Sequence, residues 1–393
     1  MARSYRVGIA GFGVAGATTA FLLARDGHAV TVMEQAADVG PIGAGVLLQA
    51  SGQTVLRHLG LLESVVAHAA PIEMLDAQHL DRSQLIRTVY SELEPECRAY
   101  GVHRGVLFRA LENAVNTQPV ELRLHSEITT REVKPDGVYL TDHTGRRHGP
   151  FDFIVCGDGS RSRLRKACGF RARVMAYDHG TLWVTVPGTA VQGRLLQIVR
   201  RNQRMCGLLP LGDGLCSLYW GLPLREFPEV RANGLDPLKR EILSYAPEAV
   251  EMLDLVVDFE QLLLTSYRHV WMRRCHDRHT LFLGDAAHAM SPHLGQGINL
   301  AMVDAYRFAD CLRTAPNPPA AFRQFVQSQR AYLRYYSAIT FLLSPFFQSD
   351  WRILGWGRDL ALPLLPRIPW VKRQMLLTVS GLKSGFLGGR IRI

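Results

Sequence analysis

The fold of this chain is decided by one stretch near its N-terminus, Val7-Gly8-Ile9-Ala10-Gly11-Phe12-Gly13-Val14-Ala15-Gly16. Its first part, Val7 to Ala10, is a short apolar run of the kind that forms a buried strand in a parallel sheet. Its glycines then have the spacing G-x-G-x-x-G, and the small residues from Ala17 to Ala24 predict a helix. A strand, a tight glycine turn and a helix therefore come first, as in a βαβ unit.

A second predicted strand, Ala29 to Met33, ends in an acidic residue, Glu34. In such a unit Gly11 makes the turn, Gly13 lets the backbone approach a pyrophosphate, and Gly16 lets the helix pack on the sheet. An acid about 20 residues further on binds ribose hydroxyls and disfavours a 2′-phosphate. The unit therefore predicts a bound dinucleotide, NAD or FAD rather than NADP.

Two later predicted strands also end in acids. Phe151 to Cys156 is followed by Gly157-Asp158-Gly159, and Leu281 to Leu283 is followed by Gly284-Asp285-Ala286-Ala287-His288. A glycine-rich loop from Pro292 to Asn299 then opens a predicted helix, whose N-terminus suits an anionic or electron-rich ligand. Three such segments would surround one extended ligand, which favours FAD over the shorter NAD.

A change of pattern marks the region from about Ala172 to Val270, where β-branched and aromatic residues predict an inserted antiparallel sheet. On its strand from Leu215 to Leu222, Cys216, Leu218 and Trp220 share one face, and Ser217 and Tyr219 share the other. One face would either line a substrate pocket over the cofactor or pack in a core.

The predicted fold class is α/β, with a Rossmann-type FAD-binding domain, an inserted antiparallel β-sheet substrate domain and a helical C-terminal region. We expect residues 1–71, 101–171 and 272–335 to form the discontinuous FAD-binding domain, residues 72–100 and 172–271 the substrate domain, and residues 336–393 a helical cap. The tail 351–393 mixes apolar and aromatic residues with Arg and Lys. It would pack on the FAD-binding domain, pair with a second subunit or rest on a membrane.

Composition narrows the possible functions. The net charge is +10, but the arginines are scattered and no nucleic-acid motif occurs, so we expect anionic small ligands and no nucleic acid. The seven cysteines are far apart and have no zinc spacing, which predicts free thiols in the cytoplasm and no metal site. No uncharged run approaches the length of a membrane span.

Three motifs follow one another along the chain: Gly11-x-Gly13-x-x-Gly16, Asp158-Gly159-x-x-Ser162-x-x-Arg165 and Gly284-Asp285-Ala286-Ala287-His288-x-x-x-Pro292-x-x-Gly295-Gln296-Gly297-x-Asn299. In this order they resemble the single-component (group A) FAD-dependent aromatic hydroxylases, the family of para-hydroxybenzoate hydroxylase and the ubiquinone-pathway hydroxylases. The resemblance covers about residues 5 to 310. It does not identify the substrate.

The resemblance implies a set of FAD-binding residues. Arg104 would lie near the ribityl chain and pyrophosphate, Asp285 would bind the ribityl chain, and Asp158 would serve both FAD and NAD(P)H. The full implied set is Gly11, Gly13, Val14, Ala15, Gly16, Glu34, Gln35, Gly43, Ala44, Gly45, Arg104, Leu107, Asp158, Gly284, Asp285, Pro292, Gly295, Gln296, Gly297, Ile298 and Asn299.

The activity that the resemblance implies is a monooxygenase (hydroxylase) reaction. NADH or NADPH would reduce FAD transiently, and O2 would then form a C4a-hydroperoxyflavin that inserts one oxygen atom into an electron-rich aromatic or phenolic substrate. His293, in the loop that would face the flavin, or Tyr219 could act as the base that ionises a phenol. His288 would instead orient its loop by a hydrogen bond. The enzyme would be a monomer or a homodimer.

Two other functions stay open at this point. A flavin dehydrogenase or reductase on the same scaffold would transfer no oxygen and would be reoxidised slowly. A membrane-associated binding protein that uses the basic apolar tail would need no flavin.

Overall fold

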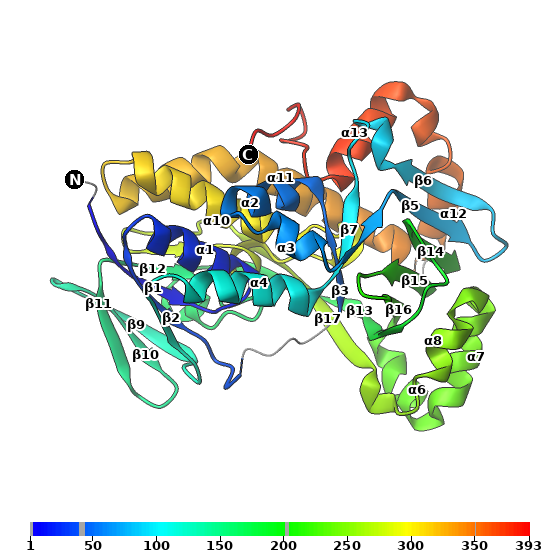
Figure 1. Cartoon of the computed structure of the whole chain (residues 1–393), viewed down its shortest axis with the longest axis horizontal. Coiled ribbons are helices and arrows are strands. Elements are labelled where there is room, and N and C mark those ends of the chain that lie inside the picture. The colour runs from blue at the N-terminus through cyan, green and yellow to red at the C-terminus, as the bar shows by residue number, and fades with distance from the viewer. Residues whose placement is uncertain (1–2, 39–43, 201–203, 350) are drawn as a thin grey trace.

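The structure is a computed structural model that describes residues 3–38, 44–200, 204–349 and 351–393 (Figure 1). Its centre is a five-stranded parallel sheet in the order β18-β12-β1-β2-β8. The strands are β1 (Arg6–Ala10), β2 (Ala29–Met33), β8 (Val120–Arg123), β12 (Phe153–Cys156) and β18 (Thr280–Phe282). The Rossmann-type sheet that the sequence predicts is therefore confirmed.

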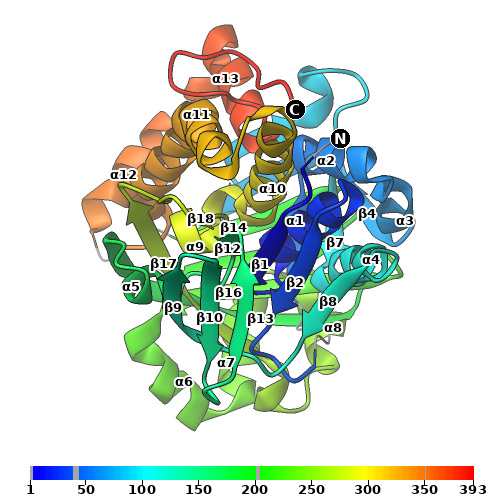
Figure 2. The same cartoon turned by 90° about the vertical axis from the view of Figure 1, so that its left-hand side faces the viewer.

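Helices cover one face of this sheet. α1 (Val14–Arg25), α4 (Arg104–Asn116) and α10 (Gly297–Thr314) share one buried apolar cluster with β1 and β2. α10 also packs on α2 (Ala50–Leu59) and on the long helix α11 (Pro318–Phe347), and Figure 2 shows α10 and α11 stacked above the parallel strands. α2 ends at Leu59, because Gly60 adopts a left-handed conformation with φ of 76°. A short helix, α3 (Leu62–Val66), follows it.

The parallel strands are aligned so that their C-terminal ends meet at one edge of the sheet. Ala10 pairs with Met33 on one side and with Cys156 on the other, and Cys156 pairs with Phe282. The three acidic strand ends of the sequence therefore lie side by side. This edge is where parallel sheets bind their ligands.

A three-stranded antiparallel sheet packs against the parallel sheet. It consists of β9 (Ile128–Lys134), β10 (Gly137–Asp142) and β11 (Arg147–Phe151), and its apolar side chains form a buried cluster with those of β12 and β18. The prediction of a single strand from Phe151 to Cys156 is wrong, because β11 ends at Phe151 and β12 begins at Phe153. The side chain of Asp152 accepts a hydrogen bond from the backbone N–H of Arg6 at 2.7 Å, which separates the two strands.

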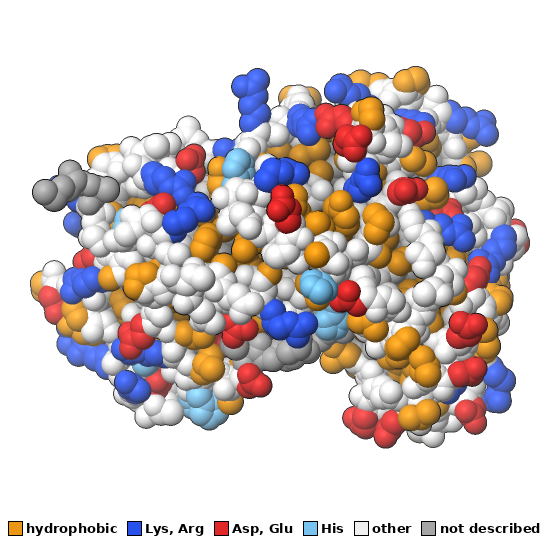
Figure 3. All heavy atoms as spheres, in the orientation of Figure 1, with side chains coloured by type: hydrophobic (Ala, Val, Ile, Leu, Met, Phe, Trp, Pro, Cys, Tyr) orange, Lys and Arg blue, Asp and Glu red, His pale blue; other side chains and the backbone are white. Residues whose placement is uncertain are grey.

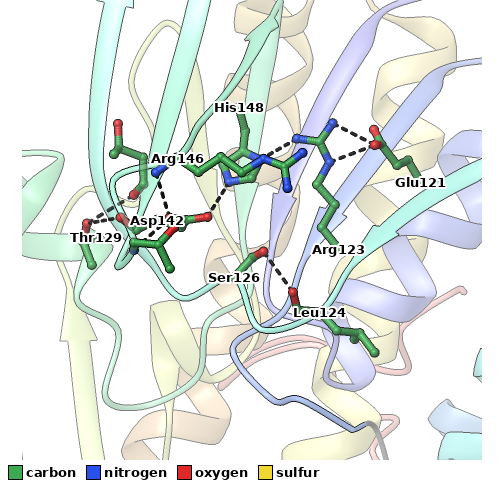
Figure 4. A network of polar contacts seen from close by, with 10 residues as sticks. Glu121, Arg123, Leu124, Ser126, Thr129, Asp142, Arg146 and His148 are labelled. Carbon is green, nitrogen blue, oxygen red and sulfur yellow. Dashed lines mark hydrogen bonds and ion pairs between the residues drawn. The ribbon is translucent and has the colours of Figure 1, made fainter.

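A polar network joins this small sheet to β8, the edge strand of the parallel sheet (Figure 4). Asp142 Oδ2 lies 2.9 Å from His148 Nε2, His148 Nδ1 lies 2.5 Å from Arg123 Nη1, and Arg123 pairs with Glu121. Burial raises the pKa of Asp142, but the hydrogen bonds that its carboxylate accepts outweigh burial and hold the pKa well below its usual value. Because the N–H of Glu34 donates to Arg123 O at 2.9 Å, the network also braces the acidic end of β2.

A seven-stranded sheet forms the second half of the molecule, in the order β17-β13-β16-β15-β14-β5-β6. Its strands are β5 (Met74–His79), β6 (Gln84–Val89), β13 (Ala172–Pro187), β14 (Arg194–Arg200), β15 (Arg204–Pro210), β16 (Leu215–Pro223) and β17 (Leu263–Met272). Every pairing is antiparallel except that of β14 with β5. The antiparallel sheet of the predicted fold is confirmed; the proposed domain boundaries stay a prediction.

The two faces of this sheet differ, as the alternation in β16 predicts. Cys216, Leu218 and Trp220 lie in an apolar core under three helices, α6 (Phe227–Asn233), α7 (Leu235–Tyr245) and α8 (Val250–Asp254). These helices interrupt the predicted run of strands, and the helical spacing of apolar residues in α7 is the signal for them. The opposite face carries Ser217 and Tyr219 and is turned towards β3 (Gly45–Leu48), whose Gly45 N–H donates to Ser217 Oγ at 3.2 Å.

The remaining elements connect these parts. β3 pairs with β7 (Ala99–His103), which also pairs with β4 (Ala69–Ile72), while α5 (Leu164–Ala167) and α9 (Asp285–His288) are single turns after β12 and β18. The tail forms short helices, α12 (Arg352–Ala361) and α13 (Pro369–Val379), as its prolines predict. It is anchored by Tyr332, whose hydroxyl donates to Gly381 O at 2.9 Å. Within the described ranges no helix combines the length and the hydropathy needed to cross a membrane.

Candidate functional site

The glycine turn between β1 and α1 leaves space at one glycine only. A Cβ on Gly16 would lie 1.9 Å from Gly11 O, and a Cβ on Gly11, whose φ is 95°, would lie 2.6 Å from Gly157 O. A Cβ on Gly13 would meet no described atom within 4 Å, although the φ of Gly13 is an ordinary −70°. The fold therefore requires Gly11 and Gly16, whereas Gly13 leaves room for a ligand.

Gly13 is also the N-cap of α1, and no side chain among the described residues caps this helix. The first N–H groups of a helix need partners, and a phosphate is a suitable one because the helix dipole also favours negative charge. The open space at Gly13 and the uncapped N–H groups therefore form a cradle for a pyrophosphate.

Glu34 lies beside this cradle and holds it in shape. Its Oε2 accepts a hydrogen bond from the N–H of Phe12 at 2.6 Å, and its Oε1 accepts one from the N–H of Ala36 at 2.9 Å. Each carboxylate oxygen keeps a further lone pair. Glu34 can thus fix the turn and still accept hydrogen bonds from ribose hydroxyls.

Asp285 and Arg104 come from distant parts of the chain and lie near each other. The side chain of Asp285 is exposed, yet the surrounding protein raises its pKa, and the charges of His288 and Arg104 oppose this rise. Such a carboxyl group is accessible, yet protein surrounds it. It therefore belongs to the wall of an enclosed space and not to the outer surface. The structure therefore brings together two of the predicted ligand-binding side chains.

Asp158 contributes an unsatisfied acceptor to the same edge of the sheet. Its Oδ1 is buried and has no hydrogen-bond partner among the residues that the structure describes. Burial raises the pKa of Asp158, and a hydrogen bond from Ser162 opposes the rise. Because buried acceptors are rarely left without a partner, a hydroxyl or N–H group of a ligand is the expected donor.

Asp304 fixes the segment from Gly284 to His288, a role that the sequence did not assign to it. Its Oδ2 accepts from the N–H of Gly284 at 3.1 Å and lies 2.5 Å from His288 Nε2. Burial lowers the pKa of His288, but the ion pair with Asp304 outweighs burial and raises it. The prediction that His288 orients its loop by a hydrogen bond is confirmed, and the signal for Asp304 was an acid inside an apolar helix.

The loop before α10 ends in a second open helix N-terminus. A Cβ on Gly297, the first residue of α10, would meet no described atom within 4 Å, and no described side chain caps the helix. Asn299 is fully buried and acts as a clamp: its Oδ1 accepts from Gln49 N at 2.9 Å, and its Nδ2 donates to Leu47 O and Gly295 O, each at 3.0 Å. Asn299 therefore holds β3 against the loop and leaves the helix end open.

Gln296, in the same loop, links it to the tail. Its Nε2 donates to Val379 O at 2.7 Å, so the end of α13 helps to fix this loop.

The other predicted FAD-binding residues are placed as follows. Val14, Ala15 and Leu107 are buried in the core. Gly45 packs closely on β16, since a Cβ there would lie 2.8 Å from Ser217 Cβ. Gly43 lies outside the described residues. The accessible or partly accessible members of the set are Gln35, Ala44, Pro292, Gly295 and Ile298.

His293 is held at the end of a buried polar chain. Its Nδ1 lies 2.8 Å from Ser291 Oγ and 3.4 Å from Ser344 Oγ, and the two serine hydroxyls lie 2.7 Å apart. Its Nε2 is buried without a hydrogen-bond partner among the described residues. Burial, with a smaller effect of the nearby His179, lowers the pKa of His293 to about 4, so the imidazole is neutral at pH 7 and its Nε2 can accept a hydrogen bond.

This chain of polar groups continues away from His293. Ser344 and Ser291 oppose the rise that burial causes in the pKa of Tyr177. The hydroxyl of Tyr177 lies 2.9 Å from His269 Nδ1, and His269 Nε2 lies 2.8 Å from Ser337 Oγ. Tyr177 and His269 are 92 residues apart along the chain, and His269 and Ser337 are 68 apart, so no local sequence pattern predicts these contacts.

Tyr219, the other predicted base, is engaged elsewhere. Its hydroxyl accepts a hydrogen bond from Gln197 Nε2 at 2.5 Å, and its ring lies 5.0 Å from that of Trp183. Burial raises the pKa of Tyr219. A phenol that burial keeps protonated is suited to hydrogen bonding rather than to accepting a proton.

These features suit one long anionic ligand. The cradle at Gly13 and Glu34 would accommodate a pyrophosphate and a ribose, Asp285 would accept from a polyol chain, and the N-terminus of α10 would favour a group that gains negative charge. This sequence of chemical groups is that of FAD, and the open positions of the structure fit it.

Comparisons with known proteins agree with this assignment. Residues 4–317 match the family described as "FAD binding domain". The 3-amino-4-hydroxybenzoate 2-monooxygenase of Streptomyces cremeus is 30% identical over 348 residues, which are 82% of this chain and 82% of that protein. Kynurenine 3-monooxygenase of Anopheles gambiae is 28% identical over 76% of this chain, and the match spans 65% of its length, just under two thirds.

Solved structures show the same fold. HpxO of Klebsiella pneumoniae, complexed with FAD, has a TM-score of 0.83 at 19% identity and covers 98% of this chain and 100% of that chain. PqsL of Pseudomonas aeruginosa, in complex with 2-aminobenzoylacetate, has a TM-score of 0.79 at 24% identity over 90% of this chain and 99% of that chain. At these identities the likeness concerns the fold alone.

Proposed function

Because the chain belongs to the FAD binding domain family, we propose that it is an FAD-dependent monooxygenase that acts on a small, electron-rich aromatic substrate. It would use NADH or NADPH and O2 and insert one oxygen atom. The names of its relatives support this reaction, since they are a 3-amino-4-hydroxybenzoate 2-monooxygenase and a kynurenine 3-monooxygenase. They also favour oxygen insertion over the dehydrogenase alternative.

The observation that carries the proposal is the pair of open helix ends. Gly13 at α1 and Gly297 at α10 are the glycines of the two motifs whose missing side chains leave free space. A pyrophosphate beside α1 and the electron-accepting ring beside α10 would use both ends. When bound there, FAD supplies the redox and oxygen-activating chemistry.

The substrate would lie between the loop before α10 and the polar face of the seven-stranded sheet. On this face Trp183 Nε1 donates to Thr265 Oγ1 at 2.8 Å, and Thr185 Oγ1 lies 3.4 Å from Ser217 Oγ. The other face is apolar and is covered by α6 to α8. We therefore propose that residues 72–100 and 172–271 bind the substrate through aromatic rings and hydroxyl groups, and that residues 336–393 cover it.

His293 is the group that we propose to act on the proton of the substrate. It is neutral at pH 7, its Nε2 is free to accept, and Ser291 and Ser344 hold its ring through Nδ1. A neutral imidazole in hydrogen-bond reach of a phenol accepts a hydrogen bond from its O–H group, which polarises this bond and makes the ring more electron-rich. Tyr219 would serve as a hydrogen-bonding group of the pocket rather than as the base.

The proposal is tested by loading the purified protein with FAD and measuring NADPH and NADH oxidation with phenols, aminobenzoates and kynurenine. The expected result is oxidation stimulated by one class of compound, with a product heavier by one oxygen atom in equal amount. Oxidation that produces hydrogen peroxide alone with every compound would favour an oxidase or dehydrogenase, and no bound flavin at all would contradict the site.

A peripheral membrane contact is a further part of the proposal. Among the side chains of residues 351–370 that the structure describes, seven large hydrophobic ones are exposed, and hydrophobic side chains are visible at the upper right of Figure 3. The seven are Trp351, Ile353, Leu360, Leu364, Leu365, Ile368 and Trp370. The tail 351–393 carries eight Lys and Arg against one acid. Apolar and basic groups together suit an anionic lipid surface.

Co-sedimentation with anionic and neutral vesicles tests this contact. We expect binding to anionic vesicles only, and loss of binding in a Leu360→Gln/Trp370→Gln variant; equal binding to neutral vesicles, or none, would contradict it. We place the enzyme in the cytoplasm because its seven cysteines are free thiols. We also propose that it is a monomer or a homodimer.

A further inference from the structure

A large pocket, separate from the glycine cradle, is lined by arginines. It has a volume of about 1390 Å³ and lies between the ends of β13 and β17 and helix α11. Five arginines line it: Arg171, Arg173, Arg273, Arg330 and Arg334. Arg330 and Arg334 are one turn apart on α11, and Arg173 is paired in register with Trp271 across β13 and β17. The arginines therefore converge from three elements.

The positive charge of this pocket is not compensated. All five arginines are exposed, and none forms an ion pair with any residue that the structure describes. The only acid in the lining is Asp304, which is fully buried and already occupied by His288 and the N–H of Gly284. Like charges at i and i+4 of a helix repel each other, so an anion between them would be stabilising.

The pocket also offers an aromatic surface. Trp271 is half-buried and stacks on His269 with ring centroids 4.0 Å apart, while the guanidinium carbon of Arg173 lies 5.7 Å from the Trp271 ring. A flat ring beside several guanidinium groups can hold a base by stacking and its phosphates by bidentate hydrogen bonds. The chemistry of the lining is thus that of a site for a phosphorylated nucleoside.

The position of the pocket suggests which nucleotide binds. α9 begins at Asp285, which we expect to bind FAD, and its last residues, Ala287 and His288, line the arginine pocket. The chain contains one G-x-G-x-x-G stretch, and FAD would occupy it. An enzyme of the proposed function needs a nicotinamide nucleotide as well, and this nucleotide must have a site of another kind.

Resting on the proposed function, we propose that the arginine pocket binds the adenosine end of NADPH, with Trp271 beside the base and the arginines around the phosphates. Two pyrophosphate charges need fewer than five guanidinium groups. The excess of arginines suits the additional 2′-phosphate, so the enzyme would prefer NADPH to NADH.

The test is calorimetric binding of adenosine 2′,5′-bisphosphate and of 5′-ADP to the FAD-loaded protein. We expect the bisphosphate to bind at least about tenfold more tightly than 5′-ADP, and an Arg330→Gln/Arg334→Gln variant to weaken its binding by about 10- to 100-fold. The matched control is Arg278→Gln/Arg323→Gln, two exposed arginines that line a different pocket. It should change binding less than twofold.

Three results would overturn the proposal: no preference for the 2′-phosphate, equal binding by the double variant, or displacement of the bisphosphate by inorganic phosphate at equal concentration. Because binding is measured without turnover, these results are independent of the oxygen-transfer reaction. A protein that fails this test but still oxygenates a substrate would keep its proposed function and lose only this nucleotide site.

Discussion

Replacing Gly13 by Ala tests whether this glycine is needed for ligand binding rather than for folding. A Cβ at Gly13 meets no described atom within 4 Å, and its φ of −70° suits any residue. The stability of the FAD-free protein should therefore change by less than about 0.5 kcal/mol. A methyl group would stand where the pyrophosphate approaches α1. Loss of one charge-assisted hydrogen bond there would cost about 1.5–3 kcal/mol, which weakens FAD binding by about 10- to 100-fold.

Two other glycine variants serve as controls for this prediction. Gly16→Ala would bring a Cβ within 1.9 Å of Gly11 O, so it should destabilise the FAD-free protein itself. Gly357→Ala, inside α12, also enters open space; it should leave FAD affinity unchanged and raise stability by up to about 1 kcal/mol, because Ala favours a helix over Gly. Urea unfolding of the FAD-free proteins and titration with FAD, followed by flavin fluorescence, measure the two quantities. Unchanged FAD affinity in Gly13→Ala, or a loss of stability as large as that of Gly16→Ala, would refute the reasoning.

Three further predictions concern buried polar groups. Asn299→Leu leaves three backbone groups without their partner and should lower the free energy of unfolding by about 3 kcal/mol or more in urea titrations; a loss under 1 kcal/mol would show that the clamp is unimportant. Burial lowers the pKa of His269 from 6.5 to about 4, so the unfolded state binds the extra proton and stability should fall by about 3 kcal/mol between pH 6.5 and 4. His269→Gln should flatten that decline, and an identical pH profile would speak against it. His293→Gln should reduce the hydroxylation rate by about 100-fold with little effect on FAD affinity, whereas an unchanged rate at every pH would exclude His293 as the base.

The sequence predicted the parts of the site that repeat a local pattern. The strand, turn and helix around Gly13 follow from glycine spacing and apolar runs, and Glu34 follows from its position at the end of β2. These contacts are made within about 30 residues of chain. Local geometry determines them, so the printed sequence contains the necessary signal.

Other parts could not be predicted because distant segments create them. The clamp of Asn299 reaches Gln49 across 250 residues, and the hydrogen bond of Gln296 reaches Val379 in the tail. Even the parallel neighbour of β14, the strand β5, comes from more than a hundred residues earlier. Periodicity predicts that such strands exist, but it does not say which strands pair.

The helices α6 to α8 show a different limit. Their segment follows four strands, and we expected the run of strands to continue. The apolar residues Leu238, Ile242 and Tyr245 of α7 have helical spacing and bury one side of that helix on the sheet. In this case the signal was present, and the expectation drawn from the surrounding strands was wrong.

The central claim is that bound FAD lets this protein transfer one atom of O2 to an aromatic substrate. Its most direct test is turnover of the FAD-loaded protein under ¹⁸O₂, in ordinary water, with NADPH and the aromatic compound that most stimulates NADPH oxidation. Mass spectrometry of the product should show one ¹⁸O atom per molecule, and the reverse experiment with ¹⁶O₂ in H₂¹⁸O should show none. A product whose oxygen comes from water, or a substrate that is oxidised without gaining oxygen, would contradict the claim and favour a dehydrogenase.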